Sequence, residues 1–255
     1  MINNKIILLI KEKTIMNITL NKNDINKLFV FLLLCYIILQ GKINDLFIYL
    51  INFNFSLILI DIYISLKHFI VGFIIALIFG IPIGIFLGCF NKFSVLISPI
   101  IDIIRPIPPL SWVPFAIIWL KLTNSASSFI IFIGVVFPII IGIQNSIQKI
   151  PSVYIETGKI LGCIKKYQQI YYIIIPSIKP YLYSNIKVAS GVGWMCLVAA
   201  EMFGINGLGL GYKISYYYNL QRIDIVLIYM IILGILGLFI DEILKIIFKK
   251  TILFE

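Results

Sequence analysis

The residues of this sequence that could do chemistry are a few ionisable side chains set within long apolar segments. Glu201 ends the run VAAEMF, and burying an unpaired carboxylate at membrane depth costs ~2.5–3.5 kcal/mol or more. We therefore expect Glu201 to serve a polar path through a membrane, or the outer gate of that path beside the Gly-rich stretch that follows. The alternative is a solvated or hydrogen-bonded carboxyl at the outer interface. Because its charge would repel an anion, Glu201 is not interpreted as an anion ligand.

Two further candidates are Arg105 and His68. Arg105 lies one helical turn from Asp102, so the two side chains can form an ion pair within their segment. The alternative places Arg105 at the inner mouth of a polar path, beside backbone groups that nearby prolines leave without helical partners. His68 is the only histidine and has no His, Cys or carboxylate at ligand spacing, so we interpret it as an interfacial residue. The four cysteines are far apart and form no CxxC, so no metal site, disulfide framework or cofactor is expected.

The composition excludes a soluble globular domain. Of the 255 residues, 61% are hydrophobic and 13% are charged, whereas soluble domains have roughly 45–50% and about 25%. Mean hydropathy is +1.06, which predicts an all-α, polytopic membrane helix bundle. The net charge of +10 comes from lysines and arginines in short breaks between apolar runs. That placement indicates membrane orientation and not nucleic-acid binding.

Several segments are long and apolar enough to cross a bilayer, which takes about 20 residues of helix. Phe69–Phe90 holds 22 residues without a charge, and Phe129–Ile143, Tyr181–Met202 and Ile223–Ile240 are further predicted spans. Val95–Leu120 is also apolar but contains five prolines. Because proline removes a helix donor, this span must be broken and packed against protein or a cavity.

The start of the chain allows more than one topology, because the apolar stretches within residues 28–64 fit one span or two. With one span and a cytoplasmic N-terminus, fifteen lysines lie in the inner segments and six lysines and arginines lie elsewhere. A second early span would place the lysines of residues 149–187 outside, against the positive-inside rule. We therefore expect about six transmembrane helices with both termini cytoplasmic. Residues 1–27 are then a cytoplasmic tail, in which Met16 is an alternative start.

The longest polar break, residues 150–180, is predicted to be a cytoplasmic loop that carries a short helix. Apolar side chains recur in it, namely Val153, Ile160, Leu161 and Ile164. Gly162 then offers a break, and Pro176 leads into the next span. Such a helix could dock on a soluble partner or lie on the membrane surface, and the pattern alone leaves both open.

These residues resemble a known family. Glu156-Thr157-Gly158, followed by Gly162 and by Ile175-Pro176, is similar to the EAA loop of ABC-transporter permeases of the binding-protein-dependent import type. Four collinear segments also resemble the nitrate/sulfonate/taurine (bicarbonate) subgroup: Gly72–Gly88, Arg105–Trp119, Val188–Ile214 and Leu233–Leu244. The resemblance covers Ser65 to Lys245. The chain departs from the family pattern in having Gly158 where Ala is preferred, and in an interval from Gly162 to Pro176 that is one residue longer than usual.

The resemblance implies a permease subunit of an importer in the plasma or inner membrane, with a transmembrane domain over residues 65–248. A first transmembrane helix and an external amphipathic segment would occupy residues 28–64, and residues 249–255 would form a cytoplasmic tail. Two copies would form the translocation path. An external solute-binding protein would deliver a small solute, with an anion such as nitrate, sulfonate or taurine expected.

The resemblance also implies the site residues. Glu156, Thr157, Gly158 and Gly162 would contact a cytoplasmic ATP-hydrolysing subunit, while Glu201 and Arg105 are the candidates for the path. The chain itself has no GxxxxGK[ST] phosphate-binding loop, so it is not expected to be an enzyme. The alternatives are a passive channel, which would need no docking loop, and a membrane-embedded enzyme, for which the acids are too scattered.

Three structural features are predicted as well. Gly72, Gly80, Gly84 and Gly88 form a stripe that permits close helix packing. Tyr212 and Tyr216–Tyr218 are interpreted as an interfacial aromatic belt. Asp241 and Glu242 are predicted to pair with Lys245 at the inner end of the last span.

Overall fold

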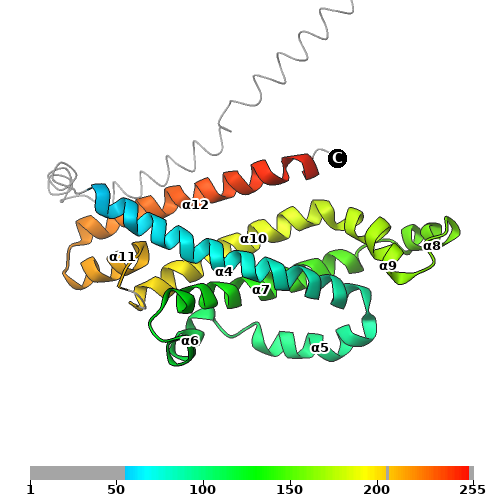
Figure 1. The fold of residues 1–255 in the computed structure, drawn as a ribbon, viewed down its shortest axis with the longest axis horizontal. Coiled ribbons are helices and arrows are strands. Elements are labelled where there is room, and N and C mark those ends of the chain that lie inside the picture. Colours follow the sequence, from blue (N-terminus) through cyan, green and yellow to red (C-terminus); the bar gives the residue numbers. More distant parts are fainter. Residues whose placement is uncertain (1–54, 205–206, 253–255) are drawn as a thin grey trace, which may run out of the picture. The chain divides into compact units, whose positions relative to one another are not determined.

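The computed structural model describes residues 55–204 and 207–252, and these residues are helical apart from short connections. Four long helices run side by side: α4 (Phe55–Cys89), α7 (Asn124–Gln148), α10 (Ile175–Met202) and α12 (Ile223–Ile252) (Figure 1). Helix α7 packs on both α4 and α10, and α10 also contacts α12. The predicted all-α class is confirmed, whereas most of the first predicted span lies outside the described residues.

Shorter helices occupy the connections. α8 (Ser152–Ile160), α9 (Lys166–Gln169) and the π-helical turn η2 (Ile170–Ile174) lie at one end of the long helices, and α11 (Leu210–Asn219) lies at the other (Figure 1). Between α4 and α7 the chain forms α5 (Asn91–Ile104), a 3₁₀ turn η1 (Pro109–Trp112) and α6 (Val113–Leu120). The two ends of the bundle therefore carry different short elements.

Three of the described helices are long and apolar enough to cross a membrane, namely Leu57–Cys89, Asn124–Gln148 and Ile223–Phe248. The two helical segments Asn91–Ile104 and Pro109–Leu120 are long and apolar enough to cross a membrane only when taken together, and they are bent by 86° relative to each other. This bend confirms that the Pro-rich segment is broken. Helix α10 is long enough to span, but its polar residues make it less apolar than the other three. The count of six spans stays a prediction.

Helix α4 continues without interruption through residue 64, at which we placed a boundary from the sequence. Its 35 residues correspond to about 52 Å of helix, which exceeds a hydrocarbon core of about 30 Å. Helix α4 is therefore longer than the core is thick, and Asp61, Ser65 and His68 share one face of its N-terminal half.

The glycine stripe of α4 is the surface on which α7 packs. A Cβ atom on Gly80 would lie 3.0 Å from Ile139 Cγ2, and one on Gly84 would lie 2.9 Å from Ile143 Cβ. Gly72 and Gly88 approach α7 in the same way, at Ile131 and Ile147. The isoleucine ridge of α7 thus fits a groove that lacks side chains, which confirms the packing role predicted for these glycines.

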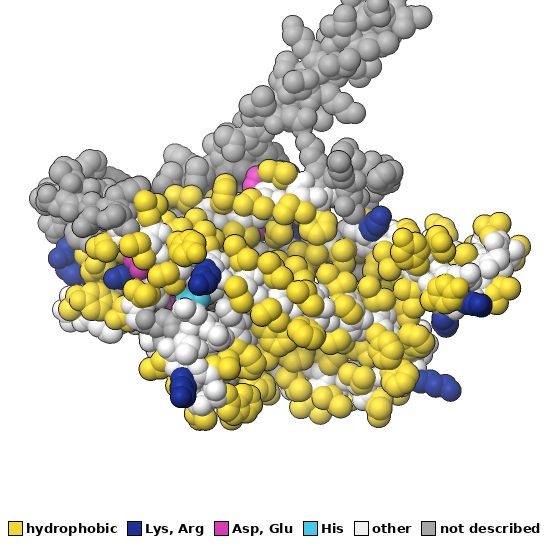
Figure 2. Space-filling model, in the orientation of Figure 1, with side chains coloured by type: hydrophobic (Ala, Val, Ile, Leu, Met, Phe, Trp, Pro, Cys, Tyr) yellow, Lys and Arg dark blue, Asp and Glu magenta, His cyan; other side chains and the backbone are white. Residues whose placement is uncertain are grey.

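The long helices expose many apolar side chains, and one face of the bundle is almost wholly hydrophobic (Figure 2). Two charged pairs lie at exposed positions of α10 and α12. Lys245 pairs with Glu242 at 3.1 Å as predicted, but Asp241 pairs with Lys187 of α10 at 3.7 Å and not with Lys245. The predicted interfacial aromatic belt is corrected at Tyr217. Its ring stacks on the buried Tyr229, with 5.9 Å between the ring centroids.

Candidate functional site

Helix α8 forms as the sequence predicts and leaves its apolar side chains exposed. Pro151 precedes the first residue of the helix, where its missing N–H costs no helical hydrogen bond. The exposed fractions are 64% for Val153, 85% for Ile160, 79% for Leu161 and 76% for Ile164. Apolar side chains this exposed on a short helix outside the bundle mark an interaction surface. Glu156 and Thr157 are exposed on the same helix.

Gly162 ends this helix for a backbone reason. Its φ is +96°, a conformation that side chains with a Cβ rarely adopt, and no neighbouring atom lies within 4 Å of its missing Cβ. The Cys163 N–H donates to the Gly158 carbonyl at 2.9 Å, which closes the C-terminal turn. The predicted break at Gly162 is therefore confirmed as a left-handed helix terminus.

The two positions at which the sequence departs from the expected EAA pattern lie close together. A π-helical turn holds one residue more than an α-helical turn, and η2 lies within the interval from Gly162 to Pro176. Ile173 of this turn lies against Gly158, and a Cβ atom on residue 158 would overlap Ile173 Cδ1. Glycine instead of alanine therefore makes room for the side chain that the π-helical turn brings in.

A second group of functional candidates is a set of polar residues at the opposite end of the bundle, which we call the Glu201 cluster: Asp61, Ser65, His68 and Glu201, which are buried, and Asn124, which is exposed. Glu201 is 2% exposed. Its Oε2 accepts hydrogen bonds from Ser65 Oγ at 2.8 Å and from the Gly211 N–H at 2.9 Å. Its Oε1 lies 3.0 Å from His68 Nδ1. The predicted alternative of a solvated carboxyl is therefore wrong, and a hydrogen-bonded one is correct.

His68 is buried and paired, which corrects its interpretation as an interfacial residue. It is 1% exposed, and its Nε2 lies 2.9 Å from Asn124 Oδ1. With the Asn124 amide oriented in this way, both ring nitrogens face acceptors. Nδ1 is placed to donate to Glu201 Oε1, and a second proton on Nε2 would make the contact an ion pair. The sequence concealed this pair because its two members are 133 residues apart.

The Glu201 cluster holds the first turn of α11. The first N–H groups of a helix have no acceptor within the helix. Here side chains of α4 and α10 provide the acceptors. Asp61 Oδ1 accepts from the Gly209 N–H at 3.4 Å, and Ser65 Oγ accepts from the Leu210 N–H at 2.9 Å. Because Gly209 has a φ of +105° and its missing Cβ would lie 2.6 Å from Glu201 Oε1, glycine is needed at this position.

One signal in the sequence could have identified this cluster. Asp61, Ser65 and His68 are spaced at i, i+4 and i+7 in an otherwise apolar segment, so they share one face of a helix. A polar face on a membrane-embedded helix requires polar partners.

Arg105 does not belong to the Glu201 cluster. It caps the C-terminal end of α5 with an exposed side chain and forms no ion pair with Asp102, so the predicted pair is wrong. The 14 residues of α5 separate it by about 21 Å from the Asn91 end. Arg105 thus lies well away from that end, at the 86° bend between α5 and η1.

No group of three or more His, Cys, Asp or Glu side chains within the described residues could hold a metal ion.

Comparison with known proteins places these features in a family. Residues 80–252 match the model of the family described as binding-protein-dependent transport system inner membrane component. The chain is 40% identical to the ABC transporter permease protein MJ0413 of Methanocaldococcus jannaschii over 73% of its length and 70% of that protein. It is 34% identical to the nitrate import permease NrtB of a Synechocystis species, over 72% of the chain and 66% of NrtB.

The fold also has a solved counterpart. A chain in a structure of inward-facing conformations of the MetNI methionine ABC transporter superimposes with a TM-score of 0.65, at 21% sequence identity. The match covers 77% of this chain and 97% of the other. By the match over residues 80–252 and the identity to these relatives, the chain belongs to the family of binding-protein-dependent transport system inner membrane components.

Proposed function

We propose that this chain is the permease subunit of an ABC importer and that residues 150–180 couple it to a cytoplasmic ATPase. The exposed apolar surface of α8 is the observation that carries the proposal, since Ile160 and Leu161 are 85% and 79% exposed on a helix outside the bundle. Glu156, Thr157, Gly158 and Gly162 shape this surface and its end. ATP hydrolysis belongs to the partner, because the chain has no phosphate-binding loop of its own.

The orientation follows from charge. The end of the bundle that carries α8 and α9 has exposed lysines, among them Lys159, Lys165 and Lys166. Figure 2 shows Lys and Arg side chains at both ends, so the orientation rests on the larger number of lysines in the segments predicted to be cytoplasmic. By the positive-inside rule the end with α8 and α9 is cytoplasmic, and the end with α11 and the Glu201 cluster is external. Both termini are then cytoplasmic, and an external binding protein delivers its solute at the α11 end.

The transported solute is a small anion in this proposal, in keeping with the relative named as a nitrate import permease. Two copies of the chain form the path, so that each copy contributes one half of its lining. Arg105 is proposed to face the path, where its uncompensated charge at the α5 bend would attract an anion. Glu201 is proposed to act at the outer gate by holding α11, and not as a solute ligand, because its oxygens are already occupied.

The test is co-purification of the tagged chain with its ATPase from native membranes. Gly162→Asp should abolish recovery of the ATPase while leaving membrane insertion intact, because a side chain at φ +96° displaces the end of α8. Gly207→Asp is the matched control, since Gly207 also has a positive φ, of +65°, and open space, but lies beside α11. Recovery of the chain without any ATPase from several detergents would favour a passive channel instead.

A further inference from the structure

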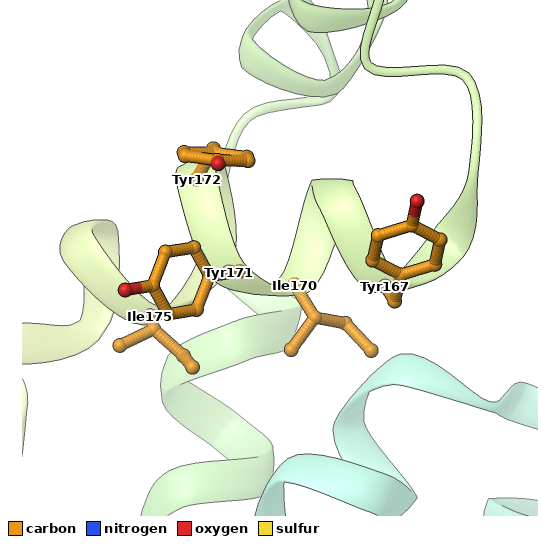
Figure 3. A pocket seen from close by; sticks show the side chains of 5 residues that line it. All are labelled: Tyr167, Ile170, Tyr171, Tyr172 and Ile175. Atoms are coloured by element: carbon orange, nitrogen blue, oxygen red, sulfur yellow. The ribbon is translucent and has the colours of Figure 1, made fainter.

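An open apolar groove lies where α9 and η2 lead into α10. Three tyrosines and two isoleucines line its volume of about 470 Å³: Tyr167, Ile170, Tyr171, Tyr172 and Ile175. Figure 3 shows Ile170 between Tyr167 and Tyr171, with Ile175 next to Tyr171. The three tyrosine rings are 63–66% exposed. We propose that this groove binds an anionic phospholipid, with an acyl chain against the rings and the headgroup phosphate at Lys165 and Lys166.

The position of the groove along the helix matches the depth of lipid headgroups. The 28 residues of α10 correspond to about 42 Å, which equals the bilayer thickness of about 40–45 Å including headgroups. In an α10 that crosses the bilayer from end to end, Ile175 at the first turn would lie near the headgroup level, and η2 and α9 continue past it. Tyrosine favours this depth because its ring is apolar and its hydroxyl is polar.

The charge around the groove specifies an anionic lipid. Residues 157–200 contain five lysines and no acidic residue. Lys187 pairs with Asp241, whereas Lys159, Lys165, Lys166 and Lys179 form no ion pair within the part of the chain that the structure describes. Lys165 Nζ lies 6.0 Å from the centre of the Tyr167 ring, which places a cation over one wall of the groove. An anionic headgroup would compensate these charges.

The groove is separate from the surface proposed to dock the ATPase. The exposed apolar side chains of α8 belong to residues 153–164, and the groove begins at Tyr167 after the chain has turned at Gly162. The π-helical turn forms the middle of the groove and also places Ile173 against Gly158. A lipid seated here would thus contact the same turn that supports the coupling helix.

Native mass spectrometry of the full chain, released from detergent with defined phosphatidylglycerol and phosphatidylcholine, tests the proposal without any ATPase. The wild type should retain phosphatidylglycerol in preference to phosphatidylcholine. Lys165→Gln/Lys166→Gln should weaken this retention by about fivefold for each charge removed. Lys92→Gln, which removes an exposed lysine outside the groove, should leave it unchanged.

A second pair of variants tests the apolar wall. Tyr171→Ser should lower retention of phosphatidylglycerol, and Tyr218→Ser should not, although the two side chains are similarly exposed, at 66% and 67%. Tyr171→Phe keeps the aromatic ring and should retain the lipid. If it does, the loss in Tyr171→Ser comes from removal of the ring that lines the groove and not from unfolding.

Three results would each overturn the proposal. The first is unchanged phosphatidylglycerol retention in the double lysine variant, and the second is equal retention of both lipids by the wild type. The third is a groove variant that loses ATPase co-purification but still retains phosphatidylglycerol. The last result would assign the groove to the ATPase. Because lipid retention is measured on the chain alone, it can fail while the permease assignment holds.

Discussion

Gly158 of α8 and Ile173 of η2 fit together as a pair, since the side chain of one fills the space that the other leaves empty. The contact packs α8 against η2, the π-helical turn that leads into α10 and that holds one residue more than an α-helical turn. Displacement of α8 by a partner would therefore be transmitted to α10 through this contact.

Gly158→Ala should force Ile173 Cδ1 to move, and because that atom ends a flexible side chain we expect a loss of no more than about 1 kcal/mol. Because the overlapping atom is the terminal methyl of Ile173, Gly158→Ala/Ile173→Val should recover most of the loss. Thermal unfolding in detergent, together with ATPase recovery, measures both effects. If Ile173→Val provides no rescue, the two residues are not coupled in the way described.

If both ring nitrogens of His68 carry protons, Glu201→Gln should destabilise the protein by about 3–5 kcal/mol, because it leaves a buried cation without its counter-charge. Glu201→Gln/His68→Gln removes both charges and should be more stable than the single variant. Glu242→Gln is the control, since its exposed pair with Lys245 is worth about 0–1 kcal/mol. A double variant no better than Glu201→Gln would show that His68 is not charged in the fold.

Solute uptake is a separate readout of the same residue. If Glu201 holds α11 at the outer gate, Glu201→Gln should alter uptake kinetics in reconstituted vesicles while ATPase association stays at the wild-type level. Uptake kinetics identical to the wild type would leave Glu201 with a structural role alone.

Gly84→Ala should separate α4 from α7, because the new Cβ would lie 2.9 Å from Ile143 Cβ and 3.0 Å from the Ile140 carbonyl oxygen. A backbone oxygen cannot rotate away, so we expect a loss of about 1–3 kcal/mol in spite of the better helix propensity of alanine. Gly191→Ala is the matched control, since no atom lies within 4 Å of its missing Cβ. Equal melting temperatures for the two variants would contradict close packing along the stripe.

Arg105→Gln should reduce anion uptake without changing assembly, if its exposed charge at the α5 bend faces the path. Lys92→Gln removes a similarly uncompensated charge at the other end of α5 and should have little effect on uptake. Transport of radiolabelled nitrate in vesicles that contain the complete importer would measure the difference. Equal uptake by both variants would remove Arg105 from the path.

The features that the sequence predicted are those determined by neighbours in the chain. The spacing of Val153 and Ile160, the break at Gly162 and the glycine stripe of α4 follow from local backbone and side-chain rules. The Pro-rich bend between α5 and η1 was predicted for the same reason.

The features that it missed depend on residues far apart in the chain. His68 contacts Glu201, 133 residues away in the sequence, and Asp61 contacts Gly209, 148 residues away. No local sequence pattern predicts either contact. The predicted pairing of Asp241 with Lys245 was wrong for the same reason, since its actual partner, Lys187, lies on another helix. The π-helical turn was signalled only as an interval one residue too long.

The capping of α11 by distant side chains has a consequence for biosynthesis. Ser65 leaves the ribosome 136 residues before Glu201, which at about 5–20 residues per second is roughly 7–30 s. Throughout that delay Asp61 and His68 must find water, lipid headgroups or the insertion machinery as substitute partners. Helix α11 can acquire its caps only after α4 and α10 have both been released and have met. Its first turn should therefore be among the last parts of the nascent protein to become protected from hydrogen exchange.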